Sequence, residues 1–335
     1  MTLDFAHKDL LSIGQLESVD IETIFKLAEK LKRERGRHAQ PLAGKKLAML
    51  FEKESLRTRF TFDIGMQELG GSAVFLDHRH ARLGSRENIG DLARNLERWV
   101  DGIVARVYRH RHLEEFAKNC SVPVINGLSD FLHPCQGLSD FFTLREKWGD
   151  FKGRRMAYIG DGNNTCHSLL QVAARLGVHF SVASPEGYEP NARVLSECLR
   201  AAQKSGAELN IYERPEEALE GAQAVYTDVW ASMGQEDEIE ERAGIFDGYR
   251  VDDRLMGYAE SDAYFMHCLP AHRGAEVTSS VIDGPNSIVF DIAENRLHVQ
   301  KALMALLMDP ERQDEGAVLR PVKAGEALST VTAGN

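Results

Sequence analysis

Long hydrophobic runs are missing from this chain. None of its apolar stretches approaches the roughly 18 residues that a membrane-spanning helix requires. Residues 1–7 contain neither a basic region nor the apolar core of a secretory signal peptide. These absences argue against a membrane span and an export signal, so we expect a cytoplasmic protein without a membrane partner.

Cysteine pairs and excess positive charge are missing as well. The cysteines are odd in number, widely spaced and never arranged as CxxC, which argues against disulfides and zinc and for a reducing compartment. The net charge of -11 repels nucleic acid, so any bound anion must be captured by a local group of arginines. We expect neither a metal nor an organic cofactor. The five cysteines are Cys120, Cys135, Cys166, Cys198 and Cys268.

Short apolar runs alternate with helical patterns from residue 46 onward. This alternation is typical of a parallel sheet flanked by helices, and 335 residues suit two such units. The sequence therefore predicts an α/β fold of two doubly wound parallel-sheet domains joined by helices. The predicted strands are 47–51, 72–76, 102–107, 122–125, 155–159, 179–183, 208–212, 223–228, 263–268 and 287–290. The predicted helices are 57–69, 87–99, 112–118, 136–147, 165–176, 190–204 and a last one from Glu294.

Turn-forming residues at 149–153 interrupt the alternation and mark a boundary between the two domains. The C-terminal helix is expected to pack back on the first domain, and the residues after it form a polar tail without a clear period. In chain order, the predicted units are a first domain at 1–134, a connecting helix at 135–149, a second domain at 150–293, the C-terminal helix at 294–310 and the tail at 311–335.

The segment Ser55-Leu56-Arg57-Thr58-Arg59 is the most informative in the chain. It follows the apolar run at 47–51 and opens a segment with helical apolar spacing. A helix start presents free backbone N–H groups, and arginine forks match phosphate oxygens in pairs. Arginine in the first helical turn is disfavoured by the helix dipole and so usually answers an anion. The segment therefore predicts a phosphate clamp rather than a solvated helix start.

Other polar residues follow the predicted strands, where open parallel sheets bind ligands. Arg106 ends one strand and either pairs with an acid at the sheet edge or joins the clamp. His133 precedes Pro134 at a helix start and is either an ordinary loop histidine or a catalytic one, while Gln136 beside it offers a donor and an acceptor. None of these residues is specific by itself.

The second half of the chain adds an acidic loop. Asp228 ends a strand and is followed by Ser232-Met233-Gly234 and an acidic run, with no basic residue before Glu241. The loop is either an N-cap with a solvated helix face or a site for a cationic amine, and it is unsuited to a dicarboxylate. Asn163 and Asn164 are turn formers or ligands of a carboxylate. Cys268 after the next strand is a buried hydrophobe or a ligand.

A nicotinamide-dependent dehydrogenase is the rival interpretation. Gly160-Asp161-Gly162 follows an apolar strand, as in a dinucleotide-binding fingerprint. The third glycine of that fingerprint is replaced by Thr165, and the first acid after the next strand, Glu186, lies beyond Pro185. Both departures weaken the dehydrogenase hypothesis.

Taken together, four motifs resemble those of ornithine carbamoyltransferases. They are Ser55-Leu56-Arg57-Thr58-Arg59, His133-Pro134-Cys135-Gln136, Asp228 with Ser232-Met233-Gly234, and His267-Cys268-Leu269-Pro270; Glu294-Asn295-Arg296 also matches. The resemblance runs from about residue 8 to 308 and implies that carbamoyl phosphate and L-ornithine give L-citrulline and phosphate, as in arginine biosynthesis. Aspartate carbamoyltransferases look similar in the first half but lack the second-half motifs. Relatives that use another amine, such as N-acetylornithine or putrescine, remain an alternative.

The resemblance also implies roles for individual residues and an assembly. The first domain would bind carbamoyl phosphate and the second ornithine, with the site shared between subunits of a homotrimer or a multiple of trimers. The implied carbamoyl phosphate ligands are Ser55, Leu56, Arg57, Thr58, Arg82, Arg106, His133, Gln136, Cys268, Leu269 and Arg296. The implied ornithine ligands are Asn164, Asp228, Ser232 and Met233, and the implied catalytic residues are Arg57, Arg106, His133, Asp228 and Cys268.

Two positions depart from the family pattern. Leu56 stands where many relatives have Thr, which removes a hydroxyl but keeps a backbone N–H, and Arg82 stands where they have Gln. For the chemistry, we hypothesise that Arg57 and Arg106 disfavour a bound ammonium while Asp228 and Cys268, as thiol or thiolate, assist its deprotonation. Arg106, His133 and the Thr58 hydroxyl would then stabilise the developing oxyanion.

Overall fold

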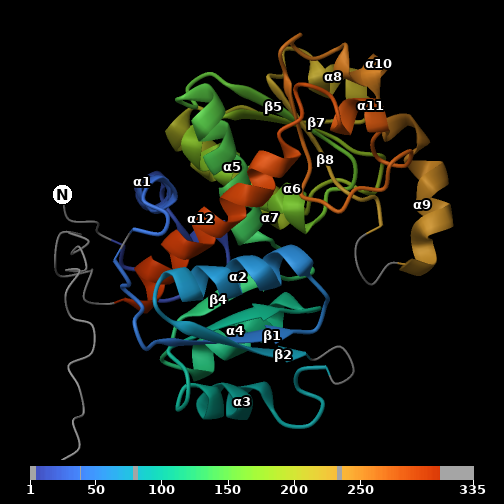
Figure 1. The fold of residues 1–335 in the computed structure, drawn as a ribbon. Helices are drawn as coiled ribbons and strands as arrows, with labels where there is room; N and C mark the ends of the chain where they lie inside the picture. Colours follow the sequence, from blue (N-terminus) through green and yellow to red (C-terminus); the bar gives the residue numbers. More distant parts are fainter. Residues whose placement is uncertain (1–4, 38, 78–81, 232–235, 310–335) are drawn as a thin grey trace, which may run out of the picture.

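The computed structural model describes residues 5–37, 39–77, 82–231 and 236–309, and these form two parallel sheets with helices around them (Figure 1). The first sheet has the strand order β2-β1-β3-β4. Its strands are β1 (Lys46–Phe51), β2 (Ser72–Asp77), β3 (Gly102–Arg106) and β4 (Val124–Leu128), and the helices between them are α2 (Leu56–Glu68), α3 (Ile89–Leu96) and α4 (His110–Asn119). The predicted α/β alternation is confirmed.

The second sheet has the strand order β7-β6-β5-β8-β9, again all parallel. Its strands are β5 (Arg155–Ile159), β6 (His179–Ala183), β7 (Leu209–Tyr212), β8 (Ala224–Thr227) and β9 (Tyr264–Met266). Its helices are α6 (Asn164–Leu176), α7 (Ala192–Ser205), α8 (Pro215–Leu219), α9 (Ile239–Ile245), α10 (Asp253–Met256) and α11 (Ser279–Ile282). In both sheets the order reverses beside the first strand, which places a ligand crevice at the carboxyl ends of the strands.

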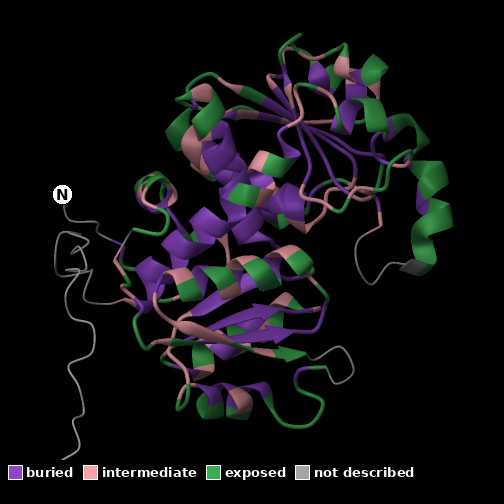
Figure 2. Cartoon of the chain, in the orientation of Figure 1, coloured by how far each residue is buried: buried purple, intermediate pink, exposed green. Residues whose placement is uncertain are grey.

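Two long buried helices connect the sheets. Helix α5 (Pro134–Trp148) leaves the first sheet and leads to β5, and its first eleven residues are all buried. Helix α12 (Val289–Met308) packs against α5 and also against α1 (Ser18–Arg33) and α2. Figure 2 shows both helices largely purple between the two sheets. Burial on all sides explains why neither helix has the polar stripe of a surface helix.

Two sequence predictions for this region were wrong. Residues 287–290 are not a strand: only Ser287 forms an isolated bridge, to Phe265, and α12 already begins at Val289 rather than at Glu294. A run of four residues, three of them apolar, cannot distinguish a buried strand from the first turn of a buried helix. The short helices α8 to α11 were not predicted, because segments of four to seven residues carry too few periods to recognise.

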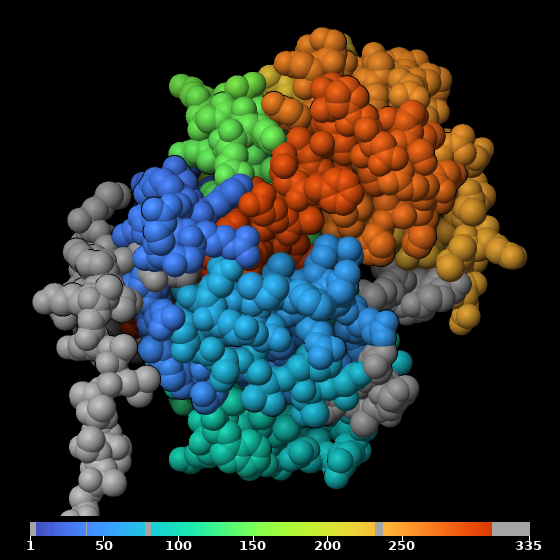
Figure 3. All heavy atoms as spheres, viewed as in Figure 1, coloured from blue at the N-terminus to red at the C-terminus, as the bar shows by residue number. Residues whose placement is uncertain are grey.

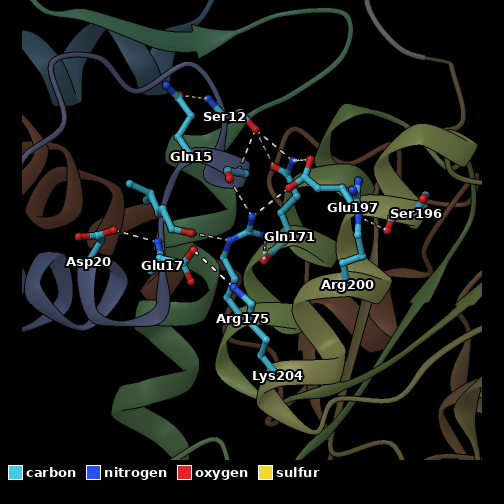
Figure 4. Close-up of polar contacts among 12 residues, drawn as sticks. Ser12, Gln15, Glu17, Asp20, Gln171, Arg175, Ser196, Glu197, Arg200 and Lys204 are labelled. Atoms are coloured by element: carbon cyan, nitrogen blue, oxygen red, sulfur yellow. Dashed lines mark hydrogen bonds and ion pairs between the residues drawn. The ribbon is translucent and has the colours of Figure 1, made fainter.

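Arg175 is one of several residues that tie the N-terminal segment to the second domain, beside the contacts of Ser12 with Gln171 and of Glu17 with Lys204. Arg175 on α6 donates from Nε to the Leu16 carbonyl at 2.6 Å and from Nη2 to the Gly14 carbonyl at 2.9 Å. The same guanidinium donates to Glu197 Oε1 at 2.9 Å. Figure 4 shows Arg175 between the N-terminal residues and α7. A segment before the first sheet therefore contributes to how the two domains are held.

In the space-filling view the two domains meet across the middle of the molecule, with the first in blue and teal and the second in green, yellow and orange (Figure 3). Among the described residues, no helix is long and apolar enough to cross a membrane.

Candidate active site

The predicted phosphate clamp lies at the start of α2. Ser55 is the N-cap, with extended backbone (φ -162°), and its Oγ accepts a hydrogen bond from the Thr58 N–H at 3.1 Å. The backbone N–H groups of the first turn point out of the helix end, where the dipole favours an anion. Thr58 is fully buried and accepts a hydrogen bond from Arg296 Nη2 at 2.7 Å. The clamp is therefore already joined to α12.

Three arginines from three elements converge on this helix start. Arg57 comes from α2, Arg106 from the end of β3 and Arg296 from α12. Burial, together with the charges of Arg296 and Arg57, lowers the pKa of Arg106 to about 9. Burial and the charge of Arg57 also lower the pKa of Arg296. Within the described ranges, neither Arg57 nor Arg296 has a carboxylate partner within 4.0 Å, which is unusual for cations away from solvent and suits an anionic ligand.

His133 and Gln136 begin α5 beside the arginines. Burial lowers the pKa of His133 well below its ordinary value, and Arg296, Arg106 and Arg57 act in the same direction. The ring is therefore neutral at pH 7 and can donate one hydrogen bond. Its backbone N–H donates to Ser168 Oγ at 2.8 Å, which fixes the chain at the helix start. Gln136 is fully buried, and its Nε2 donates to Asp140 Oδ1 at 2.8 Å.

A second group of polar residues comes from the other domain. The Cys268 thiol donates to Asp228 Oδ1 at 3.0 Å, and Asn163 Nδ2 donates to Asp228 Oδ2 at 3.1 Å. Burial, followed by the charge of Asp228, raises the pKa of the Cys268 thiol well above its ordinary value. Cys268 is thus a thiol and not a thiolate at neutral pH.

One arginine joins the two groups. Arg57 Nη2 donates to the carbonyl of Leu269, in the loop that follows β9. Leu269 has a left-handed backbone (φ 58°), and its N–H donates to His267 Nδ1 at 2.8 Å. Burial lowers the pKa of Arg57, and the nearby Cys268 and Asp228 partly oppose that effect. The structure thus brings residues predicted to bind the anion and residues predicted to bind the amine to one place between the domains.

Several predicted residues lie elsewhere. The Arg82 side chain is exposed, with its guanidinium 4.6 Å from the centroid of the Tyr108 ring, and Arg59 stacks over Phe75 at 3.9 Å. The Leu56 side chain is 68% exposed, so only its backbone faces the clamp. Asn164 donates to the Ser129 carbonyl at 2.6 Å, at the edge of the site. Ser232 and Met233 lie outside the described residues.

Sequence reasoning missed three supporting residues. Asn163 caps α6 through its Oδ1 and also holds Asp228, whereas the sequence suggested only a turn former or a carboxylate ligand. Asp140 and Tyr226 are both buried, and Tyr226 Oη donates to Asp140 Oδ2 at 3.2 Å. A charged residue in the middle of an apolar helix was the available signal for Asp140, because buried acids are rare unless paired.

One group could in principle hold a metal ion. Asp228, His267 and Cys268 offer ligand atoms within 4.8 Å of one another in the described part of the chain. Each of these side chains is already engaged: the Cys268 thiol donates to Asp228, and His267 Nδ1 accepts from Leu269. These contacts suit a hydrogen-bonded network, which needs no ion to hold it.

Comparison with known proteins agrees with this geometry. Residues 8–146 match the family model described as "Aspartate/ornithine carbamoyltransferase, carbamoyl-P binding domain", and residues 152–307 match that of the "Asp/Orn binding domain". The ornithine carbamoyltransferase of Thermococcus kodakarensis is 49% identical over 92% of this chain and 98% of its own length. The solved Pyrococcus furiosus ornithine carbamoyltransferase superposes with a TM-score of 0.89 at 48% identity, covering 92% of this chain and 99% of that one. A solved N-acetyl-L-ornithine transcarbamylase mutant gives 0.82 at 31% identity, over 90% of this chain and all of its own. The chain therefore belongs to the aspartate/ornithine carbamoyltransferase family.

Proposed function

We propose that the site between the two domains transfers the carbamoyl group of carbamoyl phosphate to the δ-amino group of L-ornithine, giving L-citrulline and phosphate. The observation that carries this proposal is the convergence of Arg57, Arg106 and Arg296 on the α2 start, opposite the Asp228–Cys268 pair. The high identity to ornithine carbamoyltransferases supports the same acceptor. A relative from Pyrococcus furiosus that is 49% identical is described as anabolic, which supports a role in arginine biosynthesis.

Carbamoyl phosphate binds to the first domain. Its phosphate accepts hydrogen bonds from the Ser55 hydroxyl, the Leu56 backbone N–H and the Arg57 guanidinium, because these groups share the α2 start. Arg106 and Arg296 neutralise the dianion from β3 and α12. The carbonyl oxygen of the carbamoyl group faces the His133 ring and the Thr58 hydroxyl, whose proton stays available because Thr58 accepts from Arg296.

Ornithine binds from the second domain. Its α-amino group is held by the Asp228 carboxylate, together with Ser232 and the backbone of Met233, and its α-carboxylate by the Asn164 amide. Cys268 and Leu269 border the carbamoyl group. We assign residues 1–134 and 150–293 as the domains for the two substrates, with α5 between them; the two family models divide between residues 146 and 152.

The reaction requires a neutral amine. A lysine-like pKa of ~10.4 leaves about 1 molecule in 2500 neutral at pH 7, which is a gap of roughly 4.6 kcal/mol. The three arginines reduce this gap, because their charge disfavours a nearby ammonium. Asp228 accepts from the Cys268 thiol and from Asn163, so the thiol orients the carboxylate and does not itself take the proton.

The bond changes follow from this arrangement. The δ-amine attacks the carbonyl carbon, and the oxyanion that develops is stabilised by Arg106, neutral His133 and the Thr58 hydroxyl. The C–O bond to phosphate then breaks, the arginines stabilise the departing phosphate, and the phosphate takes the proton that nitrogen loses. We propose that Arg82, which lies over the Tyr108 ring of its own chain, contributes to the carbamoyl phosphate site of a neighbouring subunit.

A colorimetric assay of the ureido product, run with four acceptors, tests the function. Ornithine should exceed aspartate, putrescine and N-acetylornithine in kcat/KM by about 30- to 100-fold, the effect of one or two lost charged contacts. An equal kcat/KM with aspartate, putrescine or N-acetylornithine would reject ornithine as the preferred acceptor. A change in absorbance at 340 nm with a nicotinamide and no citrulline would favour the dehydrogenase.

We also propose a homotrimer or a multiple of trimers. Leu56 and Phe60 on α2 are 68% and 56% exposed, Val74 on the edge strand β2 is 60% exposed, and Ile64 and Leu76 extend the same apolar set. An edge strand with exposed apolar residues usually meets a partner, here a second copy of the chain. Light scattering after size-exclusion chromatography should give a multiple of three times the chain mass of 37.4 kDa; a monomer would contradict the assembly.

A further inference from the structure

Behind the carbamoyl phosphate residues lies a buried hydrogen-bonded chain that the proposed mechanism does not use. Gln136 Nε2 donates to Asp140 Oδ1 at 2.8 Å, and Tyr226 Oη donates to Asp140 Oδ2 at 3.2 Å. All three side chains are fully buried. Gln136 and Asp140 are one turn apart on α5, whereas Tyr226 comes from β8 of the second sheet. These hydrogen bonds therefore connect the second domain with the residues proposed to bind carbamoyl phosphate in the first.

Asp140 decides which end of the Gln136 amide faces the carboxylate. Both oxygens of the Asp140 carboxyl group accept a hydrogen bond, one from Gln136 and one from Tyr226, so the NH₂ end of the amide faces Asp140. Burial raises the pKa of Asp140 well above its ordinary value and the charge of Asp228 adds to that effect, while the donors Gln136 and Tyr226 and the charge of Arg296 only partly oppose it. The opposite end of the amide, Gln136 Oε1, is buried and has no hydrogen-bond partner among the described residues. Gln136 Oε1 is thus an unpaired acceptor on the side of α5 where His133 lies.

We infer that Asp140 is a positioning residue that orients Gln136 so that its Oε1 accepts a hydrogen bond from the NH₂ of the carbamoyl group. The inference rests on the proposed function, because that function supplies a ligand with an N–H donor at this point. A buried polar group without a hydrogen-bond partner is costly. Because Gln136 Oε1 is such a group, the site favours a ligand with an N–H that can donate to it. Asp140 thereby helps the site to distinguish carbamoyl phosphate from acyl phosphates that lack this N–H.

Replacing Asp140 by Asn tests the orientation. In Asp140→Asn the new NH₂ can donate to Gln136 Oε1, so the Gln136 amide rotates. Its own NH₂ then faces the carbamoyl NH₂, and two donors meet without an acceptor between them. The KM for carbamoyl phosphate should rise about tenfold or more, as expected for a lost and reversed hydrogen bond. Tyr226→Phe, which leaves the Gln136–Asp140 bond in place, should raise it by about threefold or less.

A charge-conserving double variant separates orientation from packing. In Gln136→Glu/Asp140→Asn, the amide introduced at position 140 donates to the carboxylate introduced at position 136. The second oxygen of that carboxylate again accepts from the carbamoyl NH₂. The double variant should therefore recover a KM within about threefold of the parent, although each single variant is impaired. A double variant no better than Asp140→Asn would overturn the inference.

Acetyl phosphate supplies the second readout, because a methyl group replaces the NH₂. Its inhibition constant should change by less than about twofold in Asp140→Asn, since the phosphate clamp is untouched. Equal weakening of acetyl phosphate and carbamoyl phosphate would show a general loss of structure and overturn the role of Asp140, as would an unchanged KM for carbamoyl phosphate.

The test also distinguishes the inference from the proposed function. If the parent protein forms no citrulline from ornithine, the function is wrong, and Asp140 is then judged by calorimetric binding of the two phosphates alone. Parent and variants should keep the same circular dichroism spectrum. If Asp140→Asn does not fold, the double variant and a comparison of Gln136→Glu with Gln136→Leu replace it. Glu keeps an oxygen that can accept from the carbamoyl NH₂, whereas Leu has none. Only variants with that acceptor should retain the preference for carbamoyl phosphate over acetyl phosphate.

Discussion

Arg57 is the residue whose removal tests the clamp most directly. Its guanidinium donates from Nη2 to the Leu269 carbonyl, and its Nε is buried without a hydrogen-bond partner in the described part of the chain. In Arg57→Ala the bond between the domains and at least one charge-assisted bond to the phosphate are both lost. At about 1.5–3 kcal/mol for each such bond, the sum is roughly 3–6 kcal/mol. This predicts a fall in kcat/KM of about 10² to 10⁴.

The assay is citrulline formation at varied carbamoyl phosphate, with melting curves recorded in parallel. Arg57→Lys keeps the charge but not the planar fork, so it should fall between the parent and Arg57→Ala. Arg94→Ala removes the same charge from a side chain that is 63% exposed on α3 and should leave activity unchanged. An Arg57→Ala variant within tenfold of the parent, or an equal loss in Arg94→Ala, would refute the role of Arg57 in the clamp.

Three further predictions concern other groups. Cys268→Ala removes the donor to Asp228 and should raise the KM for ornithine about three- to tenfold. In the parent protein, iodoacetamide should label Cys268 slowly at pH 8, because burial raises the pKa of its thiol. Mass spectrometry of the modified peptide would measure that rate. Burial lowers the pKa of His298 on α12 to about 3, so the unfolded state binds more protons between about pH 3 and 6.5 and the free energy of unfolding should fall as the pH falls through that range; urea titrations should show a smaller fall for His298→Leu, and parallel curves would contradict this. Arg175→Ala leaves the Gly14 and Leu16 carbonyls without their donor and should lower the free energy of unfolding by about 2–4 kcal/mol. Arg200 is an exposed arginine on α7, so Arg200→Ala should change the free energy of unfolding by less than about 0.5 kcal/mol.

Much of the site was predictable because parallel strands end at one edge of a sheet. Arg106 and Asp228 both lie at or just after a strand end, and the clamp begins the helix after β1. The predictions failed where a segment is short or its partner is distant. The run at 287–290 fits a strand or a helix equally well. Its last two residues belong to α12, because the packing of that helix, and not the local pattern, decides their conformation.

The sequence by itself determined the alternation of strands and helices, and it predicted an anion site at the start of α2 and an acidic loop for an amine after Asp228. These properties depend on residue type and on periods of two to four residues, which a linear chain displays. Only the tertiary structure decided that Arg296 donates to Thr58, that Asn163 and Cys268 both donate to Asp228, and that Gln136 donates to Asp140. Such contacts join residues on different elements, or set the direction of a side chain, and both are settled by how two domains and a buried helix pack together.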